Sequence, residues 1–137
     1  MSLAQLRQLT DKLENTETFF EAFLRQAPFV MWAKDYSSGE GKMVFISDKY
    51  SRIFDVYDVE YVGKTDYDIW PDYIAREFEA QDRIVLSTER THAFEDLGVS
   101  ATEEKWETCK TIKFPIRDTG GHVMAVGGIC WPDNGRG

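Results

Sequence analysis

The sequence has little of what several classes of protein require. Its 137 residues include two cysteines and two histidines, and 24 acidic residues outnumber 16 basic ones, which gives a net charge of −8. Two cysteines cannot form a disulfide framework, which favours a reducing, cytoplasmic setting. An acidic chain is poorly suited to a phosphate backbone, so no nucleic-acid partner is expected. No apolar run approaches the roughly 18–20 residues of a membrane span, so no membrane contact by this segment is expected.

Motifs of catalysis and metal binding are also missing. There is no glycine-rich phosphate loop and no nucleophile elbow. His92 and His122 have no cysteine or histidine at ligand spacing, so no metal site is predicted. Asp66 and Asp68 are two apart and would not face one another as a glycosidase pair does, which favours a helix-capping role near Thr65. A small isomerase with a buried carboxylate is the enzymatic alternative, but the acids here cluster in loops and helix starts, so no enzyme is predicted.

The composition is that of one globular domain. Hydrophobic residues make up 42% and aromatic residues 14% of the chain, enough for a core. The patterns predict a helix over 1–27, strands over 29–35 and 42–47, a short helix N-capped by Asp48, a long helix over 71–89 beginning with Pro71, and strands over 91–97, 104–117 and 122–131. Strands in consecutive hairpins favour one antiparallel sheet with helices on one face, an α+β fold.

The N-terminal helix carries an apolar stripe. Its members are spaced three and four apart, as in a heptad seam: Leu6, Leu9, Leu13, Thr16, Phe20 and Phe23. Asn15 or Thr16 can interrupt the helix as an N-cap. The stripe has two interpretations, a helix lying on its own domain or a helix pairing with a second subunit.

The last hairpin sorts the side chains into two faces. With Thr119 and Gly120 as central turn residues, Cys109 lies opposite Cys130. One face then carries Trp106, Ile112, Phe114, Ala125, Ile129 and Trp131, and the other carries Cys109, Thr111, Lys113, Met124, Val126, Gly128 and Cys130. Both faces are largely apolar, and the middle helices cover only one. The remaining face requires the N-terminal helix, a partner subunit or both, which favours a homodimer.

Three further interpretations concern single positions. The two cysteines are either small core side chains or a redox-sensitive pair. Asp82 on the long helix is expected to form an ion pair with Lys113 on the strand beneath it. Gly127 and Gly128 lie inside a strand, which indicates close packing or a bulge.

Several segments together resemble a PAS domain of the sensory-box type, found ahead of bacterial histidine kinases and diguanylate cyclases. They are FFEAFLRQAPFVMWAKD, VFISDKYSRIFDV, GKTDYDIWPDYIAREFEAQD and WETCKTIKFPIRDTGGHVMAVGGI. The resemblance implies a five-stranded antiparallel sheet over 28–133, preceded by a dimerisation or signal-coupling helix over 1–27 and followed by a flexible tail over 134–137. The chain departs from the family's Asp-Ile-Thr ending, where it has Cys130-Trp131-Pro132-Asp133, which marks either an altered coupling to an effector domain or the boundary of a fragment.

The resemblance also implies a pocket between the sheet and the helices. Its lining would be Trp32, Ile46, Tyr50, Phe54, Trp70, Phe78, Phe94, Cys109, Thr111 and Cys130, with Lys113 and Gly128 also turned inward. Residues 65–70 lack the reactive cysteine of photoreactive flavin relatives, and 71–89 lack the histidine of haem-binding relatives. The cofactor is therefore unknown, with a non-covalent flavin or a metabolite left open. The implied function is a dimeric sensory module that detects a small molecule or a redox change. The alternative is a protein-docking PAS domain with a filled core.

Overall fold

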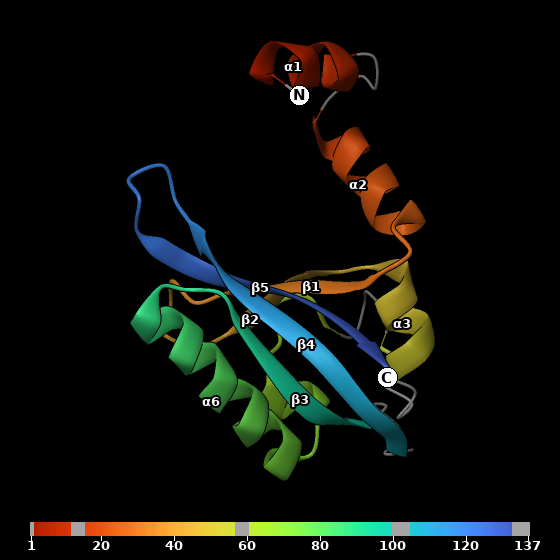
Figure 1. The fold of residues 1–137 in the computed structure, drawn as a ribbon, viewed down its shortest axis with the longest axis vertical. Helices are drawn as coiled ribbons and strands as arrows, with labels where there is room; N and C mark the ends of the chain where they lie inside the picture. Colours follow the sequence, from red (N-terminus) through yellow and green to blue (C-terminus); the bar gives the residue numbers. More distant parts are fainter. Residues whose placement is uncertain (1, 12–15, 57–60, 100–104, 133–137) are drawn as a thin grey trace.

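The structure is a computed structural model that describes residues 2–11, 16–56, 61–99 and 105–132 (Figure 1). Its centre is one antiparallel five-stranded sheet in the order β2-β1-β5-β4-β3. The strands are β1 (Val30–Asp35), β2 (Lys42–Ile46), β3 (His92–Val99), β4 (Lys105–Arg117) and β5 (Val123–Pro132). Between β2 and β3, the described residues include the helices α3 (Asp48–Phe54), α5 (Asp66–Ile69) and α6 (Asp72–Thr88). The predicted α+β class and the five-stranded antiparallel sheet are confirmed.

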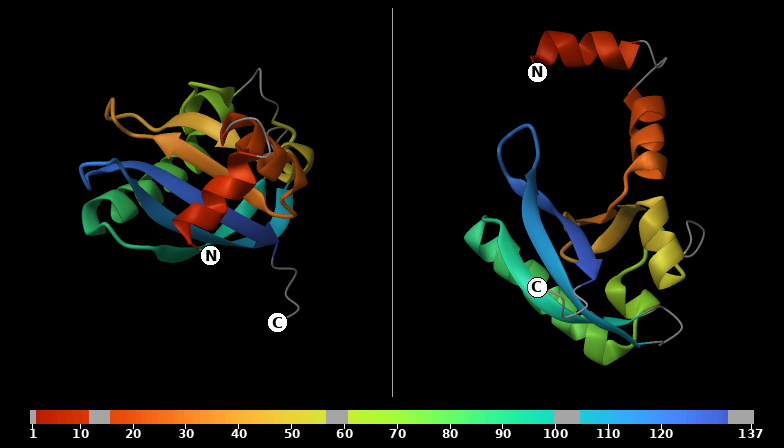
Figure 2. Two further views of the ribbon diagram at one scale, coloured as in Figure 1. Left: turned by 90° about the horizontal axis from the view of Figure 1, so that it is seen from above. Right: turned by 45° about the vertical axis from the view of Figure 1, so that its right-hand side comes forward.

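The N-terminal segment predicted as helical contains α1 (Leu3–Asp11) and α2 (Thr16–Gln26), and Asn15, one of the two predicted interruption points, lies outside the described residues. Leu13 and the side chain of Leu9 lie outside the described residues. The ring of Phe20 on α2 packs edge-on against Phe45 of β2, with centroids 5.0 Å apart. Beyond this contact the helices extend away from the sheet (Figures 1 and 2). In this arrangement α1 and α2 leave much of the outer sheet face uncovered, and a partner subunit remains the other predicted cover of that face.

Two helix starts differ by one residue from the prediction. Ser47, not Asp48, is the N-cap of α3, because the Ser47 hydroxyl accepts a hydrogen bond from the Tyr50 backbone N–H at 3.3 Å. Asp48 is instead the first helical residue, where its negative carboxylate interacts favourably with the positive end of the helix dipole. Pro71 is the N-cap position of α6.

The β4–β5 hairpin pairs two residues out of the predicted register. Its loop is longer than predicted, because the Asp118 N–H donates to the carbonyl of residue 122, and Gly121 adopts a φ of 86° that favours glycine. A bulge follows at the end of β4, so that Cys130 pairs with Thr111, and Cys109 pairs with residue 132. The prediction that Cys109 lies opposite Cys130 is therefore wrong. A shift of two residues keeps every side chain on its face, so the two predicted faces remain.

Candidate functional site

A cavity lies between the inner face of the sheet and helices α3, α5 and α6. Its volume is about 40 Å³, measured as space open to the centre of a water-sized sphere. That is a few times the roughly 10–15 Å³ that one water molecule requires. The lining consists of Trp32, Lys34, Met43, Tyr50, Phe54, Asp66, Trp70, Phe78, Asp96, Cys109, Thr111, Lys113 and Cys130.

Five aromatic rings follow one another around this cavity. The centroid distances are 5.9 Å from Trp32 to Tyr50, 4.9 Å from Tyr50 to Phe54, 5.7 Å from Phe54 to Trp70, and 5.8 Å from Trp70 to Phe78. Three of the four contacts are edge-on, which suits the quadrupoles of neighbouring rings. The rings come from β1, α3, α6 and the residue after α5, so the fold gathers them from separate parts of the chain.

Eight of the ten pocket residues predicted from the sequence line this cavity; they are Trp32, Tyr50, Phe54, Trp70, Phe78, Cys109, Thr111 and Cys130. The other two lie elsewhere. Ile46 is buried in the adjoining core, and Phe94 packs against Val85 and Val126 beneath α6. Phe94 pairs with the inward-facing Thr111 as expected, but its ring packs against the small cluster that includes Val85 of α6.

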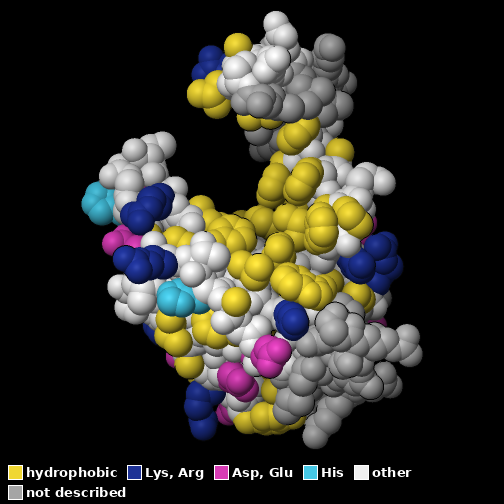
Figure 3. Space-filling view, in the orientation of Figure 1, with side chains coloured by type: hydrophobic (Ala, Val, Ile, Leu, Met, Phe, Trp, Pro, Cys, Tyr) yellow, Lys and Arg dark blue, Asp and Glu magenta, His cyan; other side chains and the backbone are white. Residues whose placement is uncertain are grey.

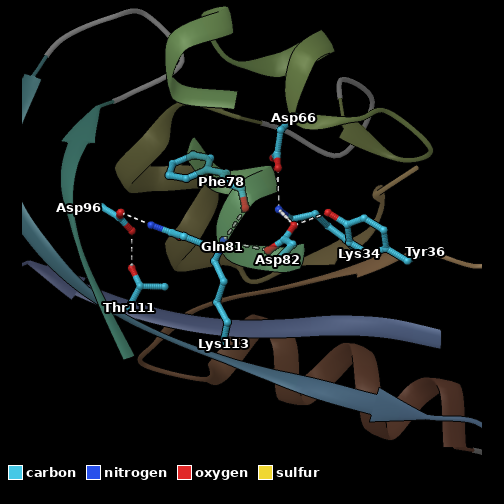
Figure 4. A network of polar contacts seen from close by, with 9 residues as sticks. All are labelled: Lys34, Tyr36, Asp66, Phe78, Gln81, Asp82, Asp96, Thr111 and Lys113. Carbon is cyan, nitrogen blue, oxygen red and sulfur yellow. Dashed lines mark hydrogen bonds and ion pairs between the residues drawn. The ribbon is translucent and has the colours of Figure 1, made fainter. Parts of the chain in front are cut away.

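Two lysines and two aspartates form a buried charged network beside the rings (Figure 4). The Lys34 ammonium contacts carboxylate oxygens of Asp66 and Asp82, each at 2.6 Å. Asp82 also accepts from Lys113 at 2.8 Å and from the Tyr36 hydroxyl at 2.5 Å. The predicted pairing of Asp82 with Lys113 is confirmed. The capping role predicted near Thr65 is confirmed for Asp68, whose carboxylate accepts from the Thr65 N–H at 3.0 Å. It is wrong for Asp66, because that carboxylate is buried in the ion pair with Lys34.

The network sets the protonation states of its members. Burial opposes the charge on Asp82, but Lys34 and Lys113 together outweigh it and lower the pKa of Asp82 to about 2. Burial likewise opposes the charge on Lys34, and Asp66 and Asp82 outweigh it, so that the pKa of Lys34 is raised. For Lys113, burial and the charge of Lys34 prevail, and its pKa is lowered. Burial and the adjacent Asp82 raise the pKa of Tyr36. The pKa shifts of Asp82 and Lys34 therefore both favour the charged forms of this ion pair.

A second polar group lies at the other side of the cavity, around Asp96 of β3. The Asp96 carboxylate accepts from the Gln81 amide and, at 3.2 Å, from the Thr111 hydroxyl (Figure 4). Two buried polar atoms have no hydrogen-bond partner among the residues that the structure describes, Nε1 of Trp70 and Oε1 of Gln81. Unpartnered buried polar atoms are costly in a folded protein, and a bound molecule or water usually explains them.

The sequence analysis missed five polar residues of this site: Lys34, Tyr36, Asp66, Gln81 and Asp96. A signal was present for some of them. In β1 and the residue that follows it, Trp32, Lys34 and Tyr36 occupy alternate positions, so continuing the strand alternation places all three on the inner face. Asp66 and Asp96 carried no such signal, because a carboxylate near a helix start or in a strand is usually exposed to solvent.

Both cysteines are free thiols buried at the cavity. A hydrogen bond between them, with burial, raises the pKa of Cys130, and the same hydrogen bond lowers the pKa of Cys109. Because Cys130 pairs with Thr111, the two cysteines are diagonal neighbours on adjacent strands. Such positions have α-carbons about 7–8 Å apart, beyond the usual range of a disulfide.

The face predicted for dimer or helix contact remains partly open. Ile112, Phe114 and Ile129 are half-buried, and Trp131 has 42% of its surface exposed. On the N-terminal helices, Leu6, Phe20 and Phe23 are exposed. Figure 3 shows hydrophobic side chains gathered along α2 and continuing onto the strands below it. The side chain of Trp106 lies outside the described residues.

A comparison with known protein families gives a match that covers most of the chain. The family model of the PAS fold matches residues 25–132. The chain belongs to the PAS family. No curated protein matches the chain. Within the described residues, no three histidine, cysteine, aspartate or glutamate side chains converge as a metal site would require, and no helix has the length and apolar content to cross a membrane.

Solved PAS-type structures match the fold at low sequence identity. The PAS domain of BvgS from Bordetella pertussis has a TM-score of 0.69 at 19% identity, covering 92% of this chain and 89% of that one. VqmA of Vibrio cholerae, solved bound to DPO, has a TM-score of 0.69 at 22% identity, covering 82% and 55%. An RNA-binding light-oxygen-voltage receptor has a TM-score of 0.71 at 10% identity, covering 85% and 33%. This PAS chain thus spans one third of that receptor and about half of VqmA, and these likenesses show the fold alone.

Proposed function

We propose that this PAS chain is the ligand-binding sensory module of a bacterial, cytoplasmic signalling protein and catalyses no reaction. The observation that carries the proposal is the cavity, which combines aromatic walls with buried polar atoms that lack partners. Binding sites for small molecules have this composition, an apolar lining with a few placed polar groups. VqmA, which has the same fold, is described as bound to DPO.

A small molecule is favoured over a redox signal as the stimulus. The diagonal placement of Cys109 and Cys130 makes a disulfide between them unfavourable without movement of the strands. Both thiols line the cavity, where they serve as small, polarisable wall atoms that leave room for a ligand.

In this proposal, the change caused by ligand binding is transmitted through the outer face of the sheet and the N-terminal helices of a homodimer. Residues 28–133 would sense the ligand, and the segment 1–27 would couple the change to a second subunit and to an effector such as a histidine kinase or a diguanylate cyclase. A ligand shifts such an equilibrium only if it binds one arrangement of the helices better than the other. The exposed Phe20, Phe23 and Trp131 supply the apolar surface that such coupling needs.

A docking module without a ligand is the second candidate. The same exposed apolar residues favour it, because they suit a protein partner whether or not the cavity is occupied. The small volume of the cavity also suits a core that its own side chains nearly fill. Residues 134–137 would then be a tail without a part in sensing.

The two candidates differ in the mass of the purified protein. For the ligand-binding module, we expect native mass spectrometry to show an added mass from a bound small molecule, and we expect this added mass to disappear under denaturing conditions. Cys130→Met should reduce its occupancy, because the longer side chain extends into the cavity. Ile129→Met is the matched control, since the neighbouring side chain lies on the outer face. A protein that carries no added mass, and whose thermal stability no member of a metabolite library raises, would support the docking module instead.

A further inference from the structure

The charges around the cavity do not cancel. Lys34 and Lys113 supply two positive groups, and Asp66, Asp82 and Asp96 supply three negative ones, so the formal charge of the described residues in this network is −1. Four of these groups are joined in ion pairs. In the part of the chain that the structure describes, Asp96 has no ammonium or guanidinium group within ion-pair distance, and its hydrogen-bond donors are the neutral Gln81 and Thr111.

Around the unpaired Asp96, some hydrogen-bond acceptors also have no donor. A carboxylate has about four acceptor sites, and Asp96 uses two of them for described partners. The unpartnered Oε1 of Gln81 is a further acceptor beside it. Both residues are buried, with 4% and 6% of their surfaces exposed. Of these two residues, Asp96 lines the cavity, so this end of the cavity presents an acceptor with a negative charge and needs a donor.

The aromatic part of the lining has the complementary property. Nε1 of Trp70 is a donor without a partner, and Trp70 is one of five rings around the cavity. Ring faces attract cations as well as other rings, as the position of the Lys113 ammonium 5.3 Å from the Phe78 centroid illustrates. The volume leaves room for about one small ring.

We propose that the cavity binds a small nitrogenous ring compound, neutral or singly positive, which donates an N–H group to Asp96 and lies among the aromatic side chains. This inference rests on the proposed ligand-binding function and narrows its ligand class. A carboxylate ligand is disfavoured, because it would bring a second negative charge next to Asp96 in a region of low dielectric constant.

Three probes with the same ring and different charge test the proposal: benzylamine, benzamide and benzoate. Their dissociation constants are measured by NMR titration of the full chain after removal of any co-purified molecule. We expect benzylamine and benzamide to bind, and benzoate to bind at least about tenfold more weakly than benzylamine, since one charge–charge interaction at contact distance accounts for such a factor.

Asp96→Asn is the deciding variant. The oxygen of the new amide still accepts from Thr111. Its NH2 group then faces Gln81, whose amide has to turn over so that Oε1 replaces Nε2 and accepts from it, and the fold is expected to survive. We expect the preference for benzylamine over benzoate to fall at least about tenfold. Glu95→Gln is the matched control, because it removes the same charge from the exposed neighbouring residue outside this cavity, and its preference should be unchanged.

Equal binding of benzoate and benzylamine, or an unchanged preference in Asp96→Asn, would overturn the inferred ligand class and leave the ligand-binding function in place. Failure of all three probes to bind would also overturn it. In that case the native mass measurement decides separately whether the cavity holds a different small molecule, so the two proposals can fail independently.

Discussion

At the scale of single residues, the cavity depends on two adjacent glycines in β5. A β-carbon on Gly128 would lie 2.3 Å from an indole carbon of Trp32, and one on Gly127 would lie 2.5 Å from a ring carbon of Phe114. Because neighbouring strand residues face opposite ways, the first ring borders the cavity and the second lies on the outer face. The close packing predicted from this pair is confirmed, and it sets how far Trp32 stands from the strand.

Gly128→Ala should therefore move Trp32 into the cavity. We expect a loss of about 1–3 kcal/mol in the free energy of unfolding, as for other overpacked cores, together with weaker binding of the co-purified molecule or of benzylamine. Gly127→Ala is the control, because it displaces Phe114 on the outer face and should lower stability similarly without changing binding. Urea unfolding and NMR titration provide the two measurements. Equal loss of binding in both variants would contradict this account of Trp32.

At the scale of elements, α6 is held to the sheet by Asp82, whose side chain is fully buried. Its pKa is about 2 in the folded protein against an ordinary value of 3.8, because Lys34 and Lys113 outweigh the effect of burial. A lowered pKa means that the unfolded chain binds protons more readily. The stabilisation is therefore complete above about pH 4 and is lost as the pH falls toward 2.

We expect the free energy of unfolding to fall by about 2 kcal/mol between pH 4 and pH 2 through this residue. Asp82→Asn should remove that part of the pH dependence, and should lower stability at pH 7 by about 3–5 kcal/mol, because two buried ammonium groups lose a partner. Glu77→Gln, on the exposed side of the same helix, should change stability by less than about 0.5 kcal/mol. If the free energy of unfolding of Asp82→Asn fell as steeply between pH 4 and pH 2 as that of the wild type, groups other than Asp82 would be the cause of the acid destabilisation.

The elements also show how far sequence reasoning reaches. Strand alternation predicted the faces of β4 and β5 correctly, although the loop that contains Gly121 shifted the pairing by two residues. Side-chain faces depend only on parity, whereas register depends on the conformation of the loop. Parity also accounts for the predicted lining residues in strands, Trp32, Cys109, Thr111 and Cys130. The other four that reach the cavity lie in or beside helices and were expected there from the resemblance, while Phe94 packs under α6 instead. The buried Asp66 could not be predicted, because a carboxylate near a helix start is usually exposed to solvent.

At the scale of the whole molecule, the two faces of the sheet form two separate surfaces. The inner face closes around the cavity, and the outer face leaves Trp131 and the apolar side chains of α2 exposed. The net charge of −8 disfavours nonspecific association between copies, so an association would have to use a defined apolar contact. The proposed homodimer would bury this outer surface.

Trp131→Glu tests the dimer without disturbing the cavity, because this side chain lies on the outer face and is 42% exposed. We expect the wild type to sediment as a dimer at micromolar concentration and Trp131→Glu to sediment mainly as a monomer, since a buried unpaired carboxylate opposes association. Tyr73→Glu is the matched control: Tyr73 is an aromatic residue of α6 that is 61% exposed and remote from the outer face, and its substitution should leave the dimer intact. The helix-coupled output proposed above requires this surface to contact a second subunit. A wild type that stays monomeric at every concentration in analytical ultracentrifugation would contradict the proposed homodimer, because Trp131 and Phe23 would then have no second subunit to contact.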